Sequence, residues 1–494
     1  MLPSLLYTDK PTDKKISVSV FKDLQLLNFI PESSVKCVLK TCTIKTREAR
    51  QKLFSRLLED EKALSVFEEL TVLSGNPALA CKIFDSSRTE NEKKLLFVNL
   101  MENFASFSEF SSQIDFGDPL TSSLSASFSK IVSSPVYGRF LIDLPKTIEA
   151  RNSIRSFSLV ICGDKVKLGE TCATPLCRTV INNAGKLGIH ISDDGDYSDT
   201  EKISPDIIEA IVRENDRNRE VLDSFYEKYH TLYDESVRYY YDECEFYLSV
   251  ITLIKKAKEI GVPFCFPDYS LSRQITAKDA YDVTLIAKGE SSIVPNDVSF
   301  TDTEPFYYLT GANDGGKTTY LRTVGVLVIL FLLGCPVPAE KAEIGGVECI
   351  YTHFPRDERF DGSGRFVEEE SRVRKIIDNC DRTSLVLLNE TYSATNEENA
   401  VKYTTELAHK LYGNGILGLY ITHQHDISEN EQIPFLQVVV DENDNNKRTF
   451  KVRKSRNHGG SFAGEILERY GLTPDALKRR FEPIIKKLND NNLL

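Results

Sequence analysis

The chain has 494 residues, of which 41% are hydrophobic and 27% charged, and its formal net charge is −12 at pH 7. This length accommodates roughly two to four domains with sizeable cores. The acidic balance argues against a surface coated with nucleic acid, so any DNA contact has to come from a local basic strip.

The sequence also argues against a secreted or membrane-bound protein. The first ten residues lack the basic segment and long apolar core of a signal peptide. The longest apolar run, 324–333, is far too short to span a bilayer. The 11 cysteines are scattered, with no C-x-x-C pair and no histidine at zinc-ligand spacing. We therefore expect a cytoplasmic protein with reduced thiols and no membrane partner.

The first 150 residues predict an all-α domain. Short apolar clusters recur at helical spacing from about 20 to 130, and residues 120–135, rich in serine, are compatible with helix or loop. Residues 151–203 form a connector or insert, in which 156–162 predict a strand with a turn and 192–199 predict an exposed loop.

Residues 204–267 predict a long helix. Ser204 and Pro205 form a typical helix start, and neither proline nor glycine follows until Gly261. One continuous helix would be about 80 Å long, and a broken pair of helices is the alternative. The apolar stripe comprises Leu222, Phe225, Tyr226, Tyr229, Tyr233, Val237, Tyr240, Cys244, Tyr247, Leu248 and Ile251. We interpret it as a packing surface rather than a base-stacking platform.

Residues 268–454 predict an α/β domain. Strands are expected at 305–310, 347–352, 384–388, 417–421 and 436–440, alternating with helical patterns. The last strand is expected to form a hairpin with 448–453 around a polar turn at 441–446. Residues 455–494 then predict two short helices, at 462–472 and 474–481.

The strongest motif in the chain is the segment 307–322, YYLTGANDGGKTTYLR. It places a glycine-rich turn between an apolar strand and a helix that opens with Lys317 and Thr318, in the spacing of a phosphate loop. Glycines let backbone N–H groups turn onto phosphate oxygens, and the helix N-terminus adds positive potential. Lys317 is expected to reach the β- and γ-phosphates, and Thr318 to bind Mg²⁺. We expect the Lys317 side chain to face solvent, so that its loss opens no cavity.

Two further strand ends carry polar groups suited to nucleotide hydrolysis. The apolar strand that begins near 385 ends in Asn389 and Glu390. Glu390 is expected to polarise the attacking water, and Asn389 stands where a Mg²⁺-associated aspartate is usual. Another strand, 419–422, is followed directly by His423. For this histidine we weigh a structural role against contact with the γ-phosphate.

These segments resemble the MutS family. Residues 310–322 resemble the family's T-G-P-N-M-G-G-K-S-T-x-L-R, and 338–345 resemble its P-A-x-x-x-x-I-G. Gly364, Arg365 and Phe366, with Glu369, lie where the family has S-x-F-x-x-E. The resemblance is strong over about 280–480 and fainter before it.

The resemblance implies a multidomain fold, in which a helical core (1–150), a connector (151–203) and a lever helix (204–267) precede an ABC-type P-loop ATPase domain (268–454) and a helical dimerisation segment (455–494). It implies a homodimer whose two ATP sites each take Gly364, Arg365 and Phe366 from the partner, and levers that connect these sites to DNA. It further implies that Glu390 and His423 are catalytic and that Thr318, Asn389 and Glu390 bind Mg²⁺. The nucleotide would be held by Gly311, Asn313, Gly315, Gly316, Lys317, Thr318 and Thr319.

The chain also departs from the family pattern. Glycine stands at 364, where the signature serine is expected, and Asn389 replaces aspartate; both argue against fast hydrolysis but not against nucleotide binding. The family reads mismatches with an F-x-E wedge. Here Phe67 and Phe107 match that tripeptide, but only in apolar helical surroundings, so we interpret both as core residues.

We therefore predict a homodimeric MutS-like ATPase that clamps double-stranded, and especially branched or structured, DNA without reading mismatches. One alternative is a slow ATPase switch that acts on a protein partner and not on DNA. A transporter-type ABC subunit is a third reading, which the long helix ahead of the ATPase domain disfavours.

Overall fold

The structure is a computed structural model that describes residues 2–155, 159–162, 165–168, 216–311, 314–355, 365–392, 397–422, 432–440, 448–455 and 480. The chain divides into two compact units. The first, which we call the helical unit, comprises Met1–Thr8 and Ser55–Glu245. The second, the sheet unit, comprises Asp9–Phe54 and Phe246–Leu494. This division differs from the expected domain at 1–150, because residues 9–54 group with the sheets.

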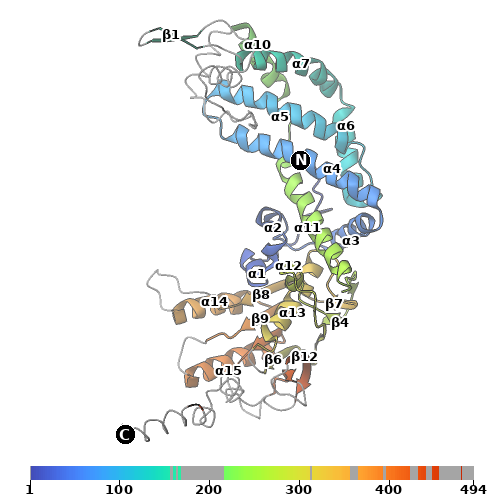
Figure 1. The fold of residues 1–494 in the computed structure, drawn as a ribbon, viewed down its shortest axis with the longest axis vertical. Helices are drawn as coiled ribbons and strands as arrows, with labels where there is room; N and C mark the ends of the chain where they lie inside the picture. Colours follow the sequence, from blue (N-terminus) through green and yellow to red (C-terminus); the bar gives the residue numbers. More distant parts are fainter. Residues whose placement is uncertain are drawn as a thin grey trace. The chain divides into compact units, whose positions relative to one another are not determined.

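The helical unit is built from long helices that pack side by side. Figure 1 shows α5 between α4 and α7. The helices of this unit are α4 (Glu61–Asp85), α5 (Glu90–Ser111), α6 (Pro119–Val132), α7 (Pro135–Arg155), α10 (Asp216–Tyr229) and η3 (Glu235–Tyr239). For the open assignment of 120–135, helix or loop, α6 gives helix as far as Val132.

Side-chain caps define where several of these helices begin. Thr89 Oγ1 accepts from the Glu92 N–H at 3.2 Å, while the Glu92 carboxylate accepts from the Arg88 N–H at 2.7 Å. Asp60 and Asp118 likewise accept first-turn N–H groups of α4 and α6. Such caps satisfy donors that a helix start leaves without intrahelical partners.

The long helix expected over 204–267 is interrupted. Helix α10 ends at Tyr229, a non-helical segment and η3 follow, and α11 (Tyr240–Glu259) then begins. A single helix was therefore the wrong prediction, and the broken pair is correct in the described part. The Asp234 side chain caps the restart by accepting from the Ser236 N–H at 2.9 Å. The expected start at Ser204 lies outside the described residues.

The aromatic stripe on these helices is a packing surface, as predicted. Phe225, Tyr229 and Tyr240 are each at most 3% exposed. Phe225 lies with its ring centroid 6.0 Å from those of Phe97 and Phe140, on α5 and α7. Rings buried in this way are not available to stack on bases.

The predicted strand at 156–162 is present as β1 (Leu159–Cys162), which pairs antiparallel with β2 (Lys165–Leu168). The rest of the predicted connector, including the loop at 192–199, lies outside the described residues. None of the helices in the described ranges combines the length and apolarity that a bilayer crossing requires.

The sheet unit contains a six-stranded sheet with the order β12-β11-β6-β10-β9-β8. Its strands are β6 (Phe306–Thr310), β8 (Cys349–His353), β9 (Ser384–Asn389), β10 (Leu417–Ile421), β11 (Phe435–Val440) and β12 (Arg448–Ser455). All neighbours are parallel except β12, which pairs antiparallel with β11. The five strands predicted in this region and the hairpin partner of the last one are thereby confirmed.

A second, four-stranded sheet has the order β3-β7-β4-β5 and was not predicted strand by strand. It comprises β3 (Asp268–Tyr269), β4 (Gln274–Ala280), β5 (Asn296–Thr301) and β7 (Lys341–Gly345). These strands alternate buried residues with polar or charged ones, as in β4, where Ile275 and Ala277 are buried. Their apolar signal is therefore weaker than that of the fully buried central strands.

The two faces of the large sheet pack against different elements. One face, including Tyr308, Val386 and Tyr420, forms a core with α14 (Arg365–Asn379) and α15 (Glu397–Gly413). Against the sheet also packs α13 (Lys317–Leu332), which is buried along almost its whole length. A Cβ at Gly325 would lie 2.5 Å from Leu24 Cδ2 and 2.8 Å from Leu387 Cδ1, so a larger residue here would force these leucine side chains to move.

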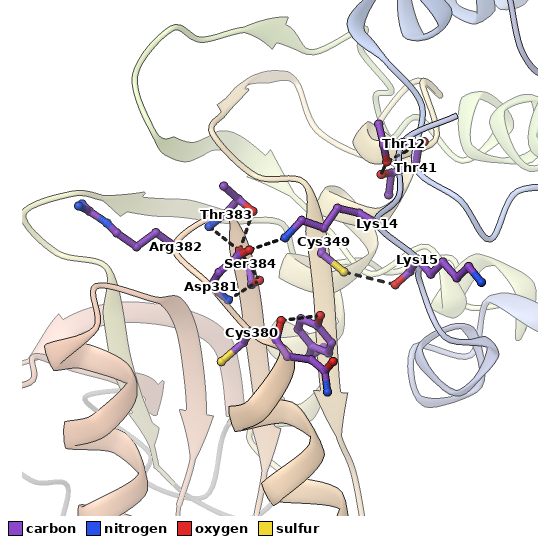
Figure 2. A network of polar contacts seen from close by, with 12 residues as sticks. Thr12, Lys14, Lys15, Thr41, Cys349, Cys380, Asp381, Arg382, Thr383 and Ser384 are labelled. Carbon is purple, nitrogen blue, oxygen red and sulfur yellow. Dashed lines mark hydrogen bonds and ion pairs between the residues drawn. The ribbon is translucent and has the colours of Figure 1, made fainter. Parts of the chain in front are cut away.

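The segment that precedes residue 54 attaches to the sheet unit. It contains α1 (Val18–Asp23), η1 (Leu26–Asn28), α2 (Glu32–Cys37) and α3 (Ile44–Glu59), the last of which continues past residue 54. Figure 2 shows its attachment: Lys14 forms an ion pair with Asp381, and Cys349 Sγ lies 3.4 Å from the Lys15 carbonyl oxygen.

Burial tends to raise the pKa of Asp381, but hydrogen bonds from Lys14, Thr383 and Ser384 outweigh it and lower that pKa to about 2. Asp381 therefore stays ionised near neutral pH. β8 starts at Cys349, and Asp381 lies three residues before the start of β9. This attachment therefore holds the end of the large sheet at which these parallel strands begin.

Candidate nucleotide-binding site

The predicted phosphate loop lies at the opposite, carboxyl edge of the sheet, between β6 and α13. Two of its glycines are required by geometry. Gly311 has φ +131°, and a Cβ there would lie 3.1 Å from the backbone nitrogen of Val438. Gly316 has φ +96° and would bring a Cβ within 3.3 Å of Phe450 Cδ1. Both φ values are unfavourable for residues with a side chain.

Helix α13 begins directly after this loop. Gly316 is its N-cap, and because glycine has no side chain, this residue cannot itself cap the first-turn N–H groups. Gly315 is buried, and Thr318 and Thr319 in the first turn are half-buried. A helix start of this kind favours an anion through its N–H groups and its dipole. Asn313 of the predicted set lies outside the described residues.

The position of Lys317 corrects one expectation. The residue is only 6% exposed rather than facing solvent, and its Nζ donates to the Gly311 carbonyl oxygen at 2.8 Å. Burial lowers the pKa of Lys317 to about 8, although the carboxylates of Glu390 and Asp314 act to raise it. The ammonium is therefore held under the loop beside two carboxylates, in the place where phosphates would neutralise it.

Glu390 is presented by a strained turn at the end of β9. Its φ is +49°, and its N–H donates to the Ile421 carbonyl oxygen at 3.1 Å. Tyr392, two residues later, also has positive φ, at +66°. Such backbone conformations cost about 1 to 3 kcal/mol each and persist only where surrounding contacts hold them.

Three side-chain contacts hold this turn. Thr391 Oγ1 lies 3.1 Å from Nδ1 of the fully buried His353, and Tyr420 Oη donates to the Thr391 carbonyl oxygen at 3.1 Å. Tyr392 Oη donates to the Glu370 carboxylate at 3.2 Å. The sequence analysis missed these anchors, since a buried histidine 38 residues away in the sequence carries no motif.

The oxygen atoms at this edge suit a hard divalent cation. Asn389 ends β9 and is 8% exposed, and its Oδ1 is buried without a hydrogen-bond partner among the described residues. The same holds for Thr310 Oγ1 at the end of β6. Mg²⁺ prefers oxygen ligands and in nucleotide sites takes several of them from water and phosphate. Thr318, Asn389 and Glu390 therefore fit Mg²⁺ as a partial donor set. In the described ranges, no group of three or more His, Cys, Asp or Glu residues could hold a metal.

Two residues of β12 also border the loop and were not predicted. Phe450 lies beside Gly316, is 46% exposed and has φ +56°. Arg448 acts electrostatically on Lys317 and lowers its pKa. Neither belongs to a phosphate-loop motif, so only the pairing of β12 with β11 could reveal them.

Several predicted site residues cannot be placed. His423 and Gly364 lie outside the described residues. Arg365 and Phe366 are described as backbone only, at the start of α14. Glu369, which follows them, is 5% exposed. The expected contribution of residues 364–366 to a partner's site stays a prediction.

Arg322, which closes the resemblance at the phosphate loop, has a structural role. Its Nε donates to Asp282 Oδ2 at 2.7 Å, and the Asp282 side chain is fully buried. Asp282 also accepts from the Thr284 N–H at the start of α12 (Thr284–Ala287). This ion pair ties the helix behind the loop to the segment that follows β4.

Comparison with known proteins matches the same region. Residues 307–480 match the model of the family described as MutS domain V. The chain is 30% identical over 213 residues to a DNA mismatch repair protein MutS from Caldicellulosiruptor saccharolyticus, covering 42% of this chain and 25% of that protein. It is 31% identical over 180 residues to one from Chlorobium phaeovibrioides, covering 36% and 20%. The matched stretch thus spans about a quarter or less of these relatives.

Proposed function

Because the chain belongs to the MutS family, we propose that it binds and hydrolyses MgATP as a homodimeric, nucleotide-gated clamp on branched or structured DNA. Domain V is the ATPase domain of that family, and the match includes the loop and Glu390. One observation carries the nucleotide part of the proposal: the buried ammonium of Lys317 lies under a glycine loop, within the electrostatic influence of Glu390.

Each residue of the site takes a distinct role in this proposal. Lys317 and the first-turn N–H groups of α13 would bind the phosphates. Thr318 and Asn389 would hold Mg²⁺, and the ion would supply positive charge that neutralises the phosphates. Glu390 orients and polarises the attacking water. Its fixed turn supports this role, because a base must stay within hydrogen-bond reach of the water. His423 contacts the γ-phosphate.

The proposed clamp does not read mismatches. Phe67 and Phe107, which begin the two F-x-E tripeptides, are both fully buried inside α4 and α5. Neither ring can reach DNA bases while it stays packed in this core. Recognition would then rest on DNA shape and phosphate contacts, which suits a clamp on junctions better than a reader of single mispairs.

A gel-shift and ATPase experiment tests the proposal. Junction, mismatched and plain duplex DNA would be compared at low salt, with and without a non-hydrolysable ATP analogue. We expect nucleotide-dependent retention of junction DNA, no preference for mismatched over plain duplex, and slow ATP turnover. ATP turnover without retention of any DNA would instead favour the slow switch that acts on a protein partner. The net charge of −12 suits a protein partner better than DNA.

The dimer is tested by truncation after residue 456. The removed segment carries two amphipathic patterns too short to be stable alone, so they need another surface, which we propose is the partner's ATPase domain. Sedimentation should show the truncated chain as a weaker dimer, with ATPase activity lowered in parallel because each site needs both subunits. A truncated chain that stays dimeric and fully active would exclude this arrangement.

A further inference from the structure

The hairpin of β11 and β12 carries a cation to the carboxyl edge of the sheet. Strand β11 pairs in parallel with β6, with Gln437 opposite Thr310, the last residue before the loop. It then continues to Val440, which pairs with Arg448 across the hairpin. Arg448 is therefore in register about three residues beyond the end of β6, the level at which the phosphate loop leaves the sheet.

Strand β12 is fixed in this position by contacts on both sides. The Asn296 amide donates to the Phe450 carbonyl oxygen at 3.0 Å and accepts from the Val452 N–H at 2.8 Å. On the loop side, a Cβ built on Gly316 would lie 3.3 Å from Phe450 Cδ1. Because Phe450 touches the loop, Arg448 is held within side-chain reach of it.

We propose that Arg448 binds the terminal phosphates of the nucleotide together with Lys317, as a second cation contributed by the same chain. This inference rests on the proposed nucleotide function. A guanidinium presents several N–H donors in a plane and suits phosphate oxygens better than a point charge does. The terminal phosphates are the target, since Lys317 occupies the neighbouring position under the loop.

The electrostatics of the loop support this assignment. Arg448 acts on Lys317 by repulsion between like charges, as expected for two cations that lie near each other. Phosphate groups between these cations would convert that repulsion into attraction on both sides. The gain grows with the charge of the nucleotide, so ATP and ADP should depend on Arg448 more than AMP does.

Binding of ATP, ADP and AMP to full-length Arg448→Ala, Arg448→Lys and wild-type protein would test the proposal. Removing a charge-assisted hydrogen bond to phosphate should weaken ATP and ADP binding by about 10- to 100-fold, with AMP binding little changed. Arg448→Lys should fall between wild type and Arg448→Ala.

Arg453→Ala is the matched control, since Arg453 is an exposed arginine on the same strand, opposite Gln437. It should bind all three nucleotides like wild type. Wild-type protein that binds no ATP would overturn the proposed function itself. ATP binding by wild type and by Arg448→Ala with equal affinity would overturn only the role of Arg448. An equal loss for AMP and ATP would also overturn it, because it would mark a role in holding the hairpin.

Discussion

Lys317 Nζ donates a hydrogen bond of 2.8 Å to the carbonyl oxygen of Gly311, the residue with which the phosphate loop begins. The lysine thus closes the loop from below and is itself buried, with only 6% of its surface exposed. The same side chain that would bind phosphate also holds the backbone around it. This double role determines how the residue should be probed.

Lys317→Met should remove most ATP binding and leave the fold intact. Methionine keeps an unbranched apolar stem in the space that alanine would leave as a cavity. Titration calorimetry would measure ATP binding, and thermal unfolding would test whether the fold is intact. Lys341→Met, at an exposed position of β7, is the control. Wild-type affinity in Lys317→Met would disprove the assignment of the loop.

ATP affinity should depend on pH through Lys317. Its pKa of about 8, lowered first by burial, means that the ammonium is charged below pH 8 and increasingly neutral above it. Phosphates favour the charged form, so binding above pH 8 must take up a proton and affinity should fall as pH rises. Without nucleotide, the buried charge should destabilise the fold below pH 8, a cost that disappears as pH rises towards the ordinary value of 10.5. Calorimetry at pH 9 in buffers of different ionisation enthalpy would detect the proton, and its absence would refute this account.

Glu390→Gln should retain ATP binding and lose hydrolysis. The amide has the shape of the carboxylate, and the backbone bond from residue 390 to Ile421 is unaffected, so the turn should persist. Loss of the general base typically costs about 10²- to 10⁴-fold in rate. Single-turnover assays would compare it with Glu406→Gln, an exposed glutamate of α15. Normal turnover in Glu390→Gln would assign the base to another residue.

Asn389→Asp should make the protein more dependent on Mg²⁺. The new carboxylate replaces a buried amide oxygen without a hydrogen-bond donor among the described residues, so it should destabilise the metal-free fold by about 1 to 3 kcal/mol. MgATP should restore stability, with equal or faster turnover. Asn414→Asp, at an exposed position, is the control for thermal unfolding with and without Mg²⁺. A large loss of activity would show that the amide is required for the metal geometry.

Asp282→Asn should destabilise the sheet unit strongly. It leaves the largely buried guanidinium of Arg322 without its carboxylate partner, which typically costs about 3 to 5 kcal/mol. Glu340→Gln breaks the exposed pair with Lys278 and should have a much smaller effect, because solvent screens that pair. Urea unfolding would compare the two, and equal small effects would mean that the buried pair contributes little.

The sequence by itself determined the features that depend on residues close together in the chain. The glycine loop, Lys317 and the run of apolar residues in each central strand lie within a few residues of one another, so their spacing specifies a strand, a turn and a helix. The pairing of β11 with β12 was also predictable, because a polar turn separates two strands close in the chain. The burial of Phe67 and Phe107 followed from helical periodicity in the same way.

Only the tertiary structure decided which distant groups meet at the loop. Lys317 is buried although it opens a helix. Arg448 comes near it through strand register rather than through a motif. The turn at Glu390 is held by His353 and Tyr420, which come from other strands. The long helix is broken after Tyr229, although the apolar stripe continues. The side chains on both sides of the break still pack against neighbouring helices, so the spacing of apolar residues gives no sign of it. Local spacing specifies elements, whereas burial and charge at a site depend on which elements the fold brings together.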